Sequence, residues 1–187
     1  FARYKDVDGD GIPYRTWPGT HPDKGAYFTR GTSRDPQAKY SERGEDYIYN
    51  MQRLLQKFET AKALVPQPVV KQSELAAAPA AIYYGSTSPA MAEAVEHLRE
   101  DGIALDSLRV RAFPFPDSIH DFIKAHDSVF VVEQNRDGQL RSLLINEFGI
   151  DPARLIAVLH YDGTPITARF IARSIAAQLQ PAPEEVA

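Results

Sequence analysis

The sequence predicts an α/β protein with an open, doubly wound, mostly parallel sheet, preceded by an irregular loop segment and a long helix. From residue 80 onward, short apolar runs alternate with helical patterns, an order typical of a parallel sheet with helices on both faces. Before that point, residues 1–36 show no periodicity, and a helical pattern follows over 41–65. The composition, 43% hydrophobic and 25% charged residues, is that of an ordinary globular protein.

The irregular segment 1–36 is rich in Gly, Pro, Asp, Thr and Arg. A structureless stretch of this length is unusual inside a compact domain, so we expect it to lie against another surface. Its Asp6, Asp8 and Asp10 resemble the first half of a calcium loop, but the twelfth position, which requires Glu, holds Trp17. We therefore predict an Asp/Gly turn and no metal site, with these three residues as the only weak candidates.

The long helix is predicted over 41–65, where apolar residues recur at three- and four-residue steps, with Ser41 as its N-cap. Pro66 and Pro68 end it. We interpret residues 1–65 as the tail of one domain, 66–79 as a linker, and 80–187 as a separate α/β domain.

Within that domain, the apolar runs predict buried strands at 80–84, 108–113, 128–132 and 154–159. The gaps between them predict helices over 89–100, 117–125, 138–148 and 165–179. Ser88 and Thr164 each precede a proline and are predicted as helix caps, because proline suits the first helical position. The tail 181–187 is expected to fray.

Polar residues follow two of the predicted strands, at the edge where open α/β sheets bind ligands or partners. We expect these two turns to form one crevice and to serve as an interface or ligand site: Gly85, Ser86, Thr87 and Ser88 after the first strand, and Glu133, Asn135, Gly138 and Gln139 after the third. The first turn could hold an anion at a helix N-terminus. The simpler alternative is a tight turn with a Ser/Thr cap in one case, and residues that cap their own turn in the other.

Several classes of function are excluded or left without support. The chain has no cysteine, which removes disulfides and cysteine-ligated iron–sulfur clusters within it and fits a cytoplasmic location. Its net charge of −4 argues against nucleic-acid binding, and no apolar run is long enough to span a membrane. We find no hydrolase elbow, Walker loop or kinase motif, and the five histidines lack zinc-ligand spacing. The start at Phe1, without Met, suggests a piece of a longer protein.

Two strings carry a family resemblance: DGDGIPYRT with the following PGTH in the first segment, and EQNRDGQL after the third strand. Residues 3–42 resemble the loop region that closes the pyrimidine-binding domain in alpha subunits of 2-oxoacid:ferredoxin oxidoreductases, particularly the 2-oxoglutarate type. The stretch IYYGSTSPAMAEAVEHLREDGIALDSLRVRAFPFP resembles the next domain of that family, which is similar to the transketolase C-terminal fold. The resemblance covers almost the whole chain.

The resemblance implies a thiamine-diphosphate enzyme that oxidatively decarboxylates 2-oxoglutarate with coenzyme A and reduces ferredoxin. In that family a separate beta subunit holds the thiamine diphosphate, its magnesium ion and an iron–sulfur cluster. The activating Glu and the substrate loop of the alpha subunit lie upstream of this domain, so we assign no catalytic and no cofactor-binding residue here.

We therefore expect a chain that is inactive alone and serves assembly, with the beta subunit and a second alpha subunit as partners. The alternative is a non-catalytic module that binds a small anionic ligand such as coenzyme A. The sequence leaves open which 2-oxoacid is used, what oligomer forms and why the chain starts at Phe1.

Overall fold

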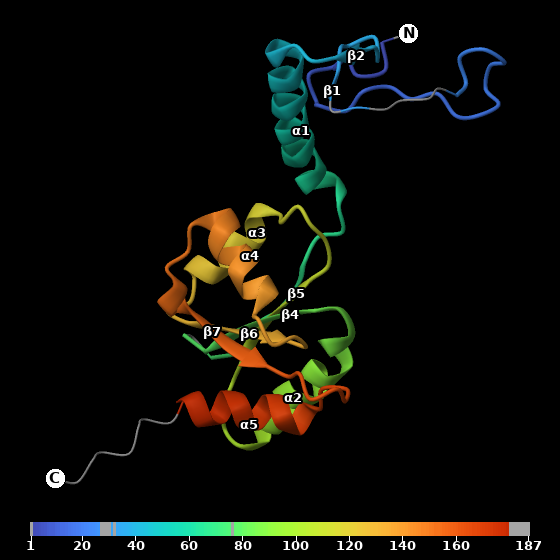
Figure 1. Ribbon diagram of the computed structural model, residues 1–187. Coiled ribbons are helices and arrows are strands. Elements are labelled where there is room, and N and C mark those ends of the chain that lie inside the picture. The colour runs from blue at the N-terminus through green and yellow to red at the C-terminus, as the bar shows by residue number, and fades with distance from the viewer. Residues whose placement is uncertain (1, 27–30, 32, 76, 180–187) are drawn as a thin grey trace. The chain divides into compact units, whose positions relative to one another are not determined.

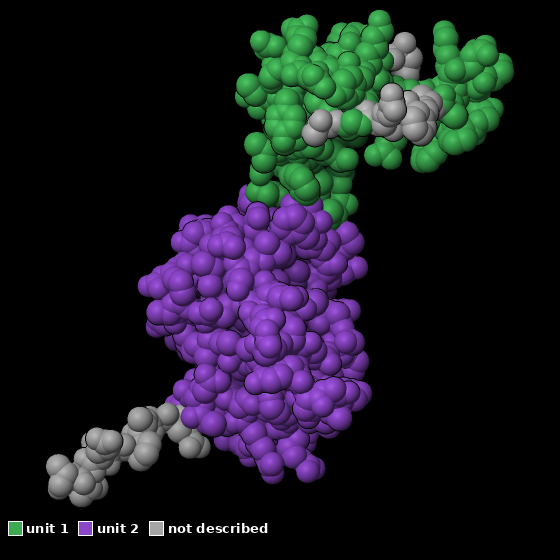
Figure 2. Space-filling view, viewed as in Figure 1, with its two compact units in different colours: residues 1–65 green, residues 66–187 purple. Residues whose placement is uncertain are grey.

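A computed structural model shows two compact units, residues 1–65 and 66–187 (Figures 1 and 2). The structure describes residues 2–26, 31, 33–75 and 77–179. The tail 181–187, which we expected to fray, lies outside the described residues.

The first unit contains a small antiparallel pair of strands, β1 (Ser33–Arg34) and β2 (Tyr40–Ser41), and the helix α1 (Gly44–Leu64). The predicted Ser41 cap is wrong, because the residue that precedes the helix is Arg43. Ser41 pairs with Ser33 in the two-stranded sheet, which holds its backbone extended. Its hydroxyl still supports the helix start, since it donates to the Asp46 carboxylate at 2.5 Å.

The N-terminal loop is fastened to α1 through its backbone. The buried Arg53 guanidinium donates to the Gly11 carbonyl at 3.0 Å, and the Thr60 hydroxyl donates to the Asp10 carbonyl at 2.6 Å. Gly11 lies against the helix backbone, where a Cβ would come within 2.3 Å of the Lys57 nitrogen, and its φ is +79°. Only glycine satisfies both the positive φ and this close approach. The loop is thus shaped by the helix that it covers.

Gly11→Ala is expected to destabilise the first unit by more than about 2 kcal/mol, from the strain of positive φ combined with the clash against α1. Gly9→Ala is the matched control, because Gly9 has a φ of +78° but nothing within 4 Å of an added Cβ. Chemical denaturation measures the free energy of unfolding of both variants. Because both positions have a positive φ, the difference between their losses reports the clash of the added Cβ with α1 alone. Equal losses in the two variants would contradict the packing described for Gly11.

The second unit is built on a five-stranded sheet in the order β3-β5-β4-β6-β7. Four strands are parallel and confirm the predicted sheet: β4 (Ala80–Tyr84), β5 (Asp106–Val110), β6 (Val129–Glu133) and β7 (Leu155–Leu159). The fifth, β3 (Val69–Lys71), pairs antiparallel with β5 at the edge and lies in the segment that we interpreted as a linker. All three of its residues are exposed, so its sequence carries no burial pattern.

Strand β5 ends three residues before the predicted boundary at 113. The apolar alternation continues through Phe113, but Val110 pairs with Tyr84, the last residue of β4. After Tyr84 the neighbouring chain turns into a short 3₁₀ helix, Gly85–Thr87, so β5 loses its pairing partner on that side. Residues 111–113 therefore leave the sheet, and the peptide between Phe113 and Pro114 is cis.

Helices cover both faces of the sheet, which confirms the doubly wound arrangement (Figure 1). One face packs against α2 (Ser88–Glu100) and α5 (Ala168–Leu179), and the other against α3 (Asp117–Lys124) and α4 (Gln139–Phe148). Successive residues of β6 alternate between the two cores, as the two-residue period of a strand requires. None of the helices in the described parts of the chain has the length and apolarity needed to cross a lipid bilayer.

Both predicted proline-based caps are wrong. Ser88 is the first residue of α2 rather than its cap, because the 3₁₀ turn runs directly into the helix. The last helix begins at Ala168, three residues after Pro165, and the Thr167 hydroxyl accepts the Phe170 N–H at 3.2 Å. Thr164 instead bonds to Asp162 within its own turn.

At the amino edge of the sheet, Asp106 anchors β5 through a buried polar cluster. Its carboxylate accepts the Ser73 N–H at 2.6 Å and lies 3.1 Å from Nε2 of His126, whose Nδ1 lies 2.7 Å from the Phe122 carbonyl. Burial raises the pKa of the Asp106 carboxyl, but the bonds from Ser73 and His126 outweigh it and hold the pKa below its ordinary value. The folded state therefore favours the ionised form.

This cluster predicts a loss of stability in acid. Because the folded pKa of Asp106 is lowered, its contribution is fully present above the ordinary pKa of about 3.9 and is lost as pH falls through the folded value. Asp106→Asn should lower the denaturation midpoint at pH 7, and its difference from the parent chain should shrink steadily below about pH 4. Asp121→Asn, on the exposed side of α3, is the control and should show no such convergence. A pH-independent difference would contradict the assignment.

Candidate functional site

The two polar turns predicted from the sequence meet at the carboxyl edge of the sheet. Strands β4 and β6 are neighbours there, although β5 lies between them in sequence, so the strand order reverses at this point. This is the switch point at which open α/β sheets place ligands. One side chain that the sequence did not single out, Gln134, joins the turns: its amide donates to the Ser86 and Thr87 hydroxyls at 3.1 Å each.

Glu133, the last residue of β6, is fully buried. The strand period turns its side chain toward the face covered by α4, where its carboxylate accepts the backbone N–H groups of Leu140 at 2.7 Å and Arg141 at 2.9 Å. Asn135 donates a third bond at 2.8 Å. Three donors compensate the burial of the charge, and the N-terminal end of the helix dipole favours it. Glu133 therefore holds the turn together and does not face a partner or ligand.

The rest of the second turn is organised by its own side chains. The Asn135 amide oxygen accepts the Asp137 and Gln139 N–H groups at 3.1 and 3.2 Å. Gly138 precedes α4 in a left-handed conformation, with a φ of +60°. Of the predicted residues in this turn, only Gln139 is left with an exposed side chain that is free to face outward.

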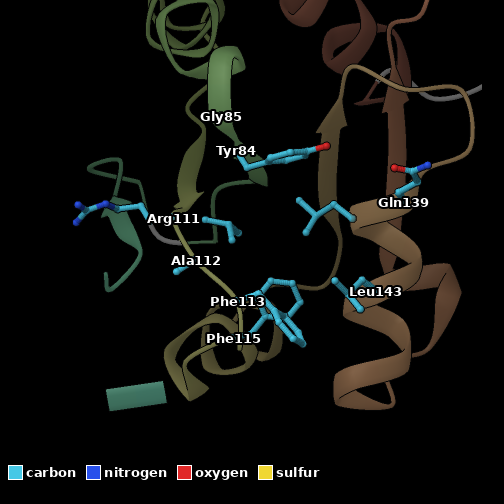
Figure 3. A pocket seen from close by; sticks show the side chains of 10 residues that line it. Tyr84, Gly85, Arg111, Ala112, Phe113, Phe115, Gln139 and Leu143 are labelled. Atoms are coloured by element: carbon cyan, nitrogen blue, oxygen red, sulfur yellow. The ribbon is translucent and has the colours of Figure 1, made fainter. Parts of the chain in front are cut away.

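A cavity of about 410 Å³ lies beside the switch point, on the α3–α4 face (Figure 3). It is bounded by the ends of β4 and β5 on one side and by the first turns of α4 on the other, and most of its wall is apolar. The lining residues include two of the predicted site residues, Gly85 and Gln139: Tyr84, Gly85, Val110, Arg111, Ala112, Phe113, Phe115, Gln139, Leu140 and Leu143. The structure therefore brings one residue from each predicted turn to the same cavity.

Most polar side chains of the two predicted turns already have hydrogen-bond partners within the protein. Ser86 and Thr87 are occupied by Gln134, Ser88 lies within α2, and Glu133 and Asn135 are used inside their own turn. The aromatic wall was missed, because Phe113 is the last residue of the predicted strand 108–113 and Phe115 lies in the connection to the next predicted helix. The second tyrosine of the run AAIYY was the available signal, since a large aromatic residue at the exposed end of a strand often contacts a ligand or partner.

The site carries no evident catalyst or metal ligand set. Within the described residues, no three His, Cys, Asp or Glu side chains lie together in a way that could hold a metal ion. The candidates in the N-terminal loop have other partners. Asp6 accepts the Gly9 and Gly11 N–H groups, Asp10 accepts the Ile12 N–H, and Asp8 accepts the Tyr14 hydroxyl. These bonds form the Asp/Gly turn.

Comparisons with known proteins find similarity to 2-oxoacid:ferredoxin oxidoreductases. Residues 77–163 match the pyruvate:ferredoxin oxidoreductase core domain II. The chain is 28% identical to subunit alpha of 2-oxoacid:ferredoxin oxidoreductase 2 from Aeropyrum pernix over 134 residues. The aligned region covers 70% of this chain and 21% of that protein.

Among solved structures, the fold is similar to that of 2-oxoglutarate:ferredoxin oxidoreductase from Magnetococcus marinus, with 2-oxoglutarate, coenzyme A and succinyl-CoA bound. The TM-score is 0.79 at 21% identity, over 95% of this chain and 30% of that one. A split-gene transketolase shares 16% identity over 59% of this chain and 42% of that one, with a TM-score of 0.48, too weak to carry an argument. The chain thus spans 21% of the length of the Aeropyrum pernix subunit and 30% of the length of the Magnetococcus marinus chain.

Glu133→Gln is expected to lower the free energy of unfolding by about 2–3 kcal/mol, because one oxygen that accepts a backbone N–H becomes a donor and a charge-assisted bond is lost. Glu147→Gln, at an exposed position of α4, the helix whose N–H groups Glu133 accepts, is the control and should change stability by less than about 0.5 kcal/mol. Urea denaturation measures both. Similar small effects in the two variants would show that the cap does not support the turn.

Proposed function

We propose that this chain, whose residues 77–163 match the pyruvate:ferredoxin oxidoreductase core domain II, is the C-terminal portion of the alpha subunit of a 2-oxoacid:ferredoxin oxidoreductase. Its role is assembly: it positions neighbouring domains and subunits and supplies no catalytic residue. The family match carries the proposal, and the similarity to an archaeal alpha subunit over 134 residues supports it.

The exposed face of α1 supports an assembly role. Tyr47, Met51 and Leu55 follow one another at four-residue steps on this face, and Leu55 is 67% exposed. Ile48 and Phe58 extend the same stripe. A contiguous apolar stripe on a helix is costly in water and marks an interaction surface. Trp17 in the N-terminal loop, 70% exposed, adds to the apolar surface of this unit.

In the complete enzyme we propose oxidative decarboxylation of 2-oxoglutarate to an acyl-coenzyme A, with transfer of electrons to ferredoxin. Thiamine diphosphate, magnesium and an iron–sulfur cluster would be held by the beta subunit. The lack of cysteine in this chain is consistent with that division. The name of the structurally similar Magnetococcus marinus enzyme supports 2-oxoglutarate as the substrate to test first.

Leu55→Asp in the complete enzyme is expected to weaken assembly at least tenfold, because a charge at the centre of a buried apolar contact loses its hydration. Native mass spectrometry measures the assembled fraction, and coenzyme A-dependent reduction of ferredoxin measures activity with 2-oxoglutarate and with pyruvate. The 187-residue chain alone should show no activity and no calorimetric binding of thiamine diphosphate.

Gln56→Asp is the control, since Gln56 lies at the flank of the stripe and is exposed. Unchanged assembly in the Leu55 variant would refute the α1 interface. Activity of the isolated chain would refute the assembly role, and a preference for pyruvate would refute only the choice of substrate.

A further inference from the structure

We propose that the cavity beside the switch point binds a neutral nitrogen-containing aromatic ring of the nucleobase class. The cavity volume of about 410 Å³ falls within the range of small-molecule sites, which are mostly apolar with a few polar groups that fix orientation. The proposal concerns this chain's own fold and does not depend on the enzyme to which the chain belongs.

The walls of the cavity suit a flat ring. Tyr84 contributes one aromatic ring at the end of β4 and Phe113 contributes another, which packs edge-to-face on the buried Phe115 with ring centroids 5.2 Å apart. Leu140 and Leu143 of α4 form the opposite side. Figure 3 shows the Tyr84 ring extending from its strand toward the side formed by α4. Stacking on aromatic side chains is a common way for proteins to bind bases without regard to their sequence.

The rim exposes apolar surface that a ligand would cover. Tyr84 is 40% exposed, Phe113 46% and Leu143 37%, and all three line the same cavity. Beneath them Val110, Phe115 and Leu140 belong to the buried core. The rim is therefore held by a rigid floor while remaining open to water.

Two neutral groups provide a polar edge. Tyr84 and Gln139 both line the cavity, and the hydroxyl of one and the amide of the other can each donate and accept. Neither has a hydrogen-bond partner among the described residues. A nucleobase edge carries donors and acceptors side by side, which such a pair can recognise.

The charges around the cavity disfavour an anion as the recognised group. Arg111 points away from the cavity in Figure 3, and its guanidinium donates to the Gln67 carbonyl at 3.4 Å. The N–H groups at the start of α4, which could otherwise bind a phosphate, are taken by Glu133 and Asn135. We therefore assign recognition to the ring, with any attached sugar or phosphate left in solvent.

The test uses adenosine, cytidine and inorganic phosphate as separate probes of the ¹⁵N-labelled chain, with binding constants from calorimetry. The expected result is binding of a nucleoside, with shifts of the Gln139 side-chain amide and the Tyr84 backbone signal, and no binding of phosphate. Tyr84→Phe and Gln139→Ala should each weaken binding about 3- to 10-fold, the effect of losing one neutral hydrogen bond. Leu143→Trp should abolish binding by filling the cavity.

Tyr161→Phe and Gln178→Ala are the matched controls, exposed residues outside the cavity lining, on the loop after β7 and on α5. Thermal unfolding of each variant shows whether weaker binding comes from a change in the cavity or from a loss of folded protein. The proposal is overturned if neither nucleoside binds at millimolar concentration, if phosphate alone produces the same shifts, or if the cavity variants bind like the controls. Equal binding of indole, unaffected by Tyr84→Phe, would overturn the polar edge.

Discussion

The buried carboxylate of Glu133 is the constraint on which the carboxyl edge of the sheet depends. It ends β6, turns toward the α3–α4 face, and accepts the Leu140 and Arg141 N–H groups in the first turn of α4 and the Asn135 amide. The helix is thereby tied to the strand that precedes it through a charge that cannot be left unsatisfied. Because the distance between strand end and helix start is fixed, Leu140 and Leu143 stand at a set separation from β4 and β5. The cavity exists in the space that this separation leaves.

A second consequence is that the edge is divided into a closed part and an open part. Between β4 and β6, Gln134 closes the switch point by bonding to Ser86, Thr87 and, through its carbonyl oxygen at 3.4 Å, the Ile166 N–H. Between the end of β5 and α4, most of the side chains that line the cavity are apolar. The polar crevice expected from the sequence is therefore filled by the protein itself, and the neighbouring space is the one available to a ligand.

The sequence alone predicted the architecture well where burial decides it. Three of the four parallel strands, β4, β5 and β6, are mostly buried, β7 is partly buried, and the apolar runs of all four were visible in the sequence. The sequence-based prediction failed where strand pairing or contacts between residues far apart in the sequence determine the structure. Strand β3 has no apolar alternation, the end of β5 is set by the turn of β4, and Gln134 acts through partners 47 and 48 residues away. The first helix start was misplaced for the same reason, since Ser41 is held by pairing with Ser33.

The apolar rim raises the question of why the cavity does not collapse. Tyr84 and Val110 are opposite each other at the last parallel pair, so β4 and β5 cannot approach further, and α4 is held off by the Glu133 cap and by Arg141, which donates to the Leu155 and Pro152 carbonyls at 2.6 and 2.8 Å. Phe115 packs on Phe148, with centroids 5.9 Å apart, and this contact fixes the floor. Each wall is thus positioned by interactions outside the cavity. A space kept open in this way is already shaped before any ligand arrives, which lowers the ordering cost of binding.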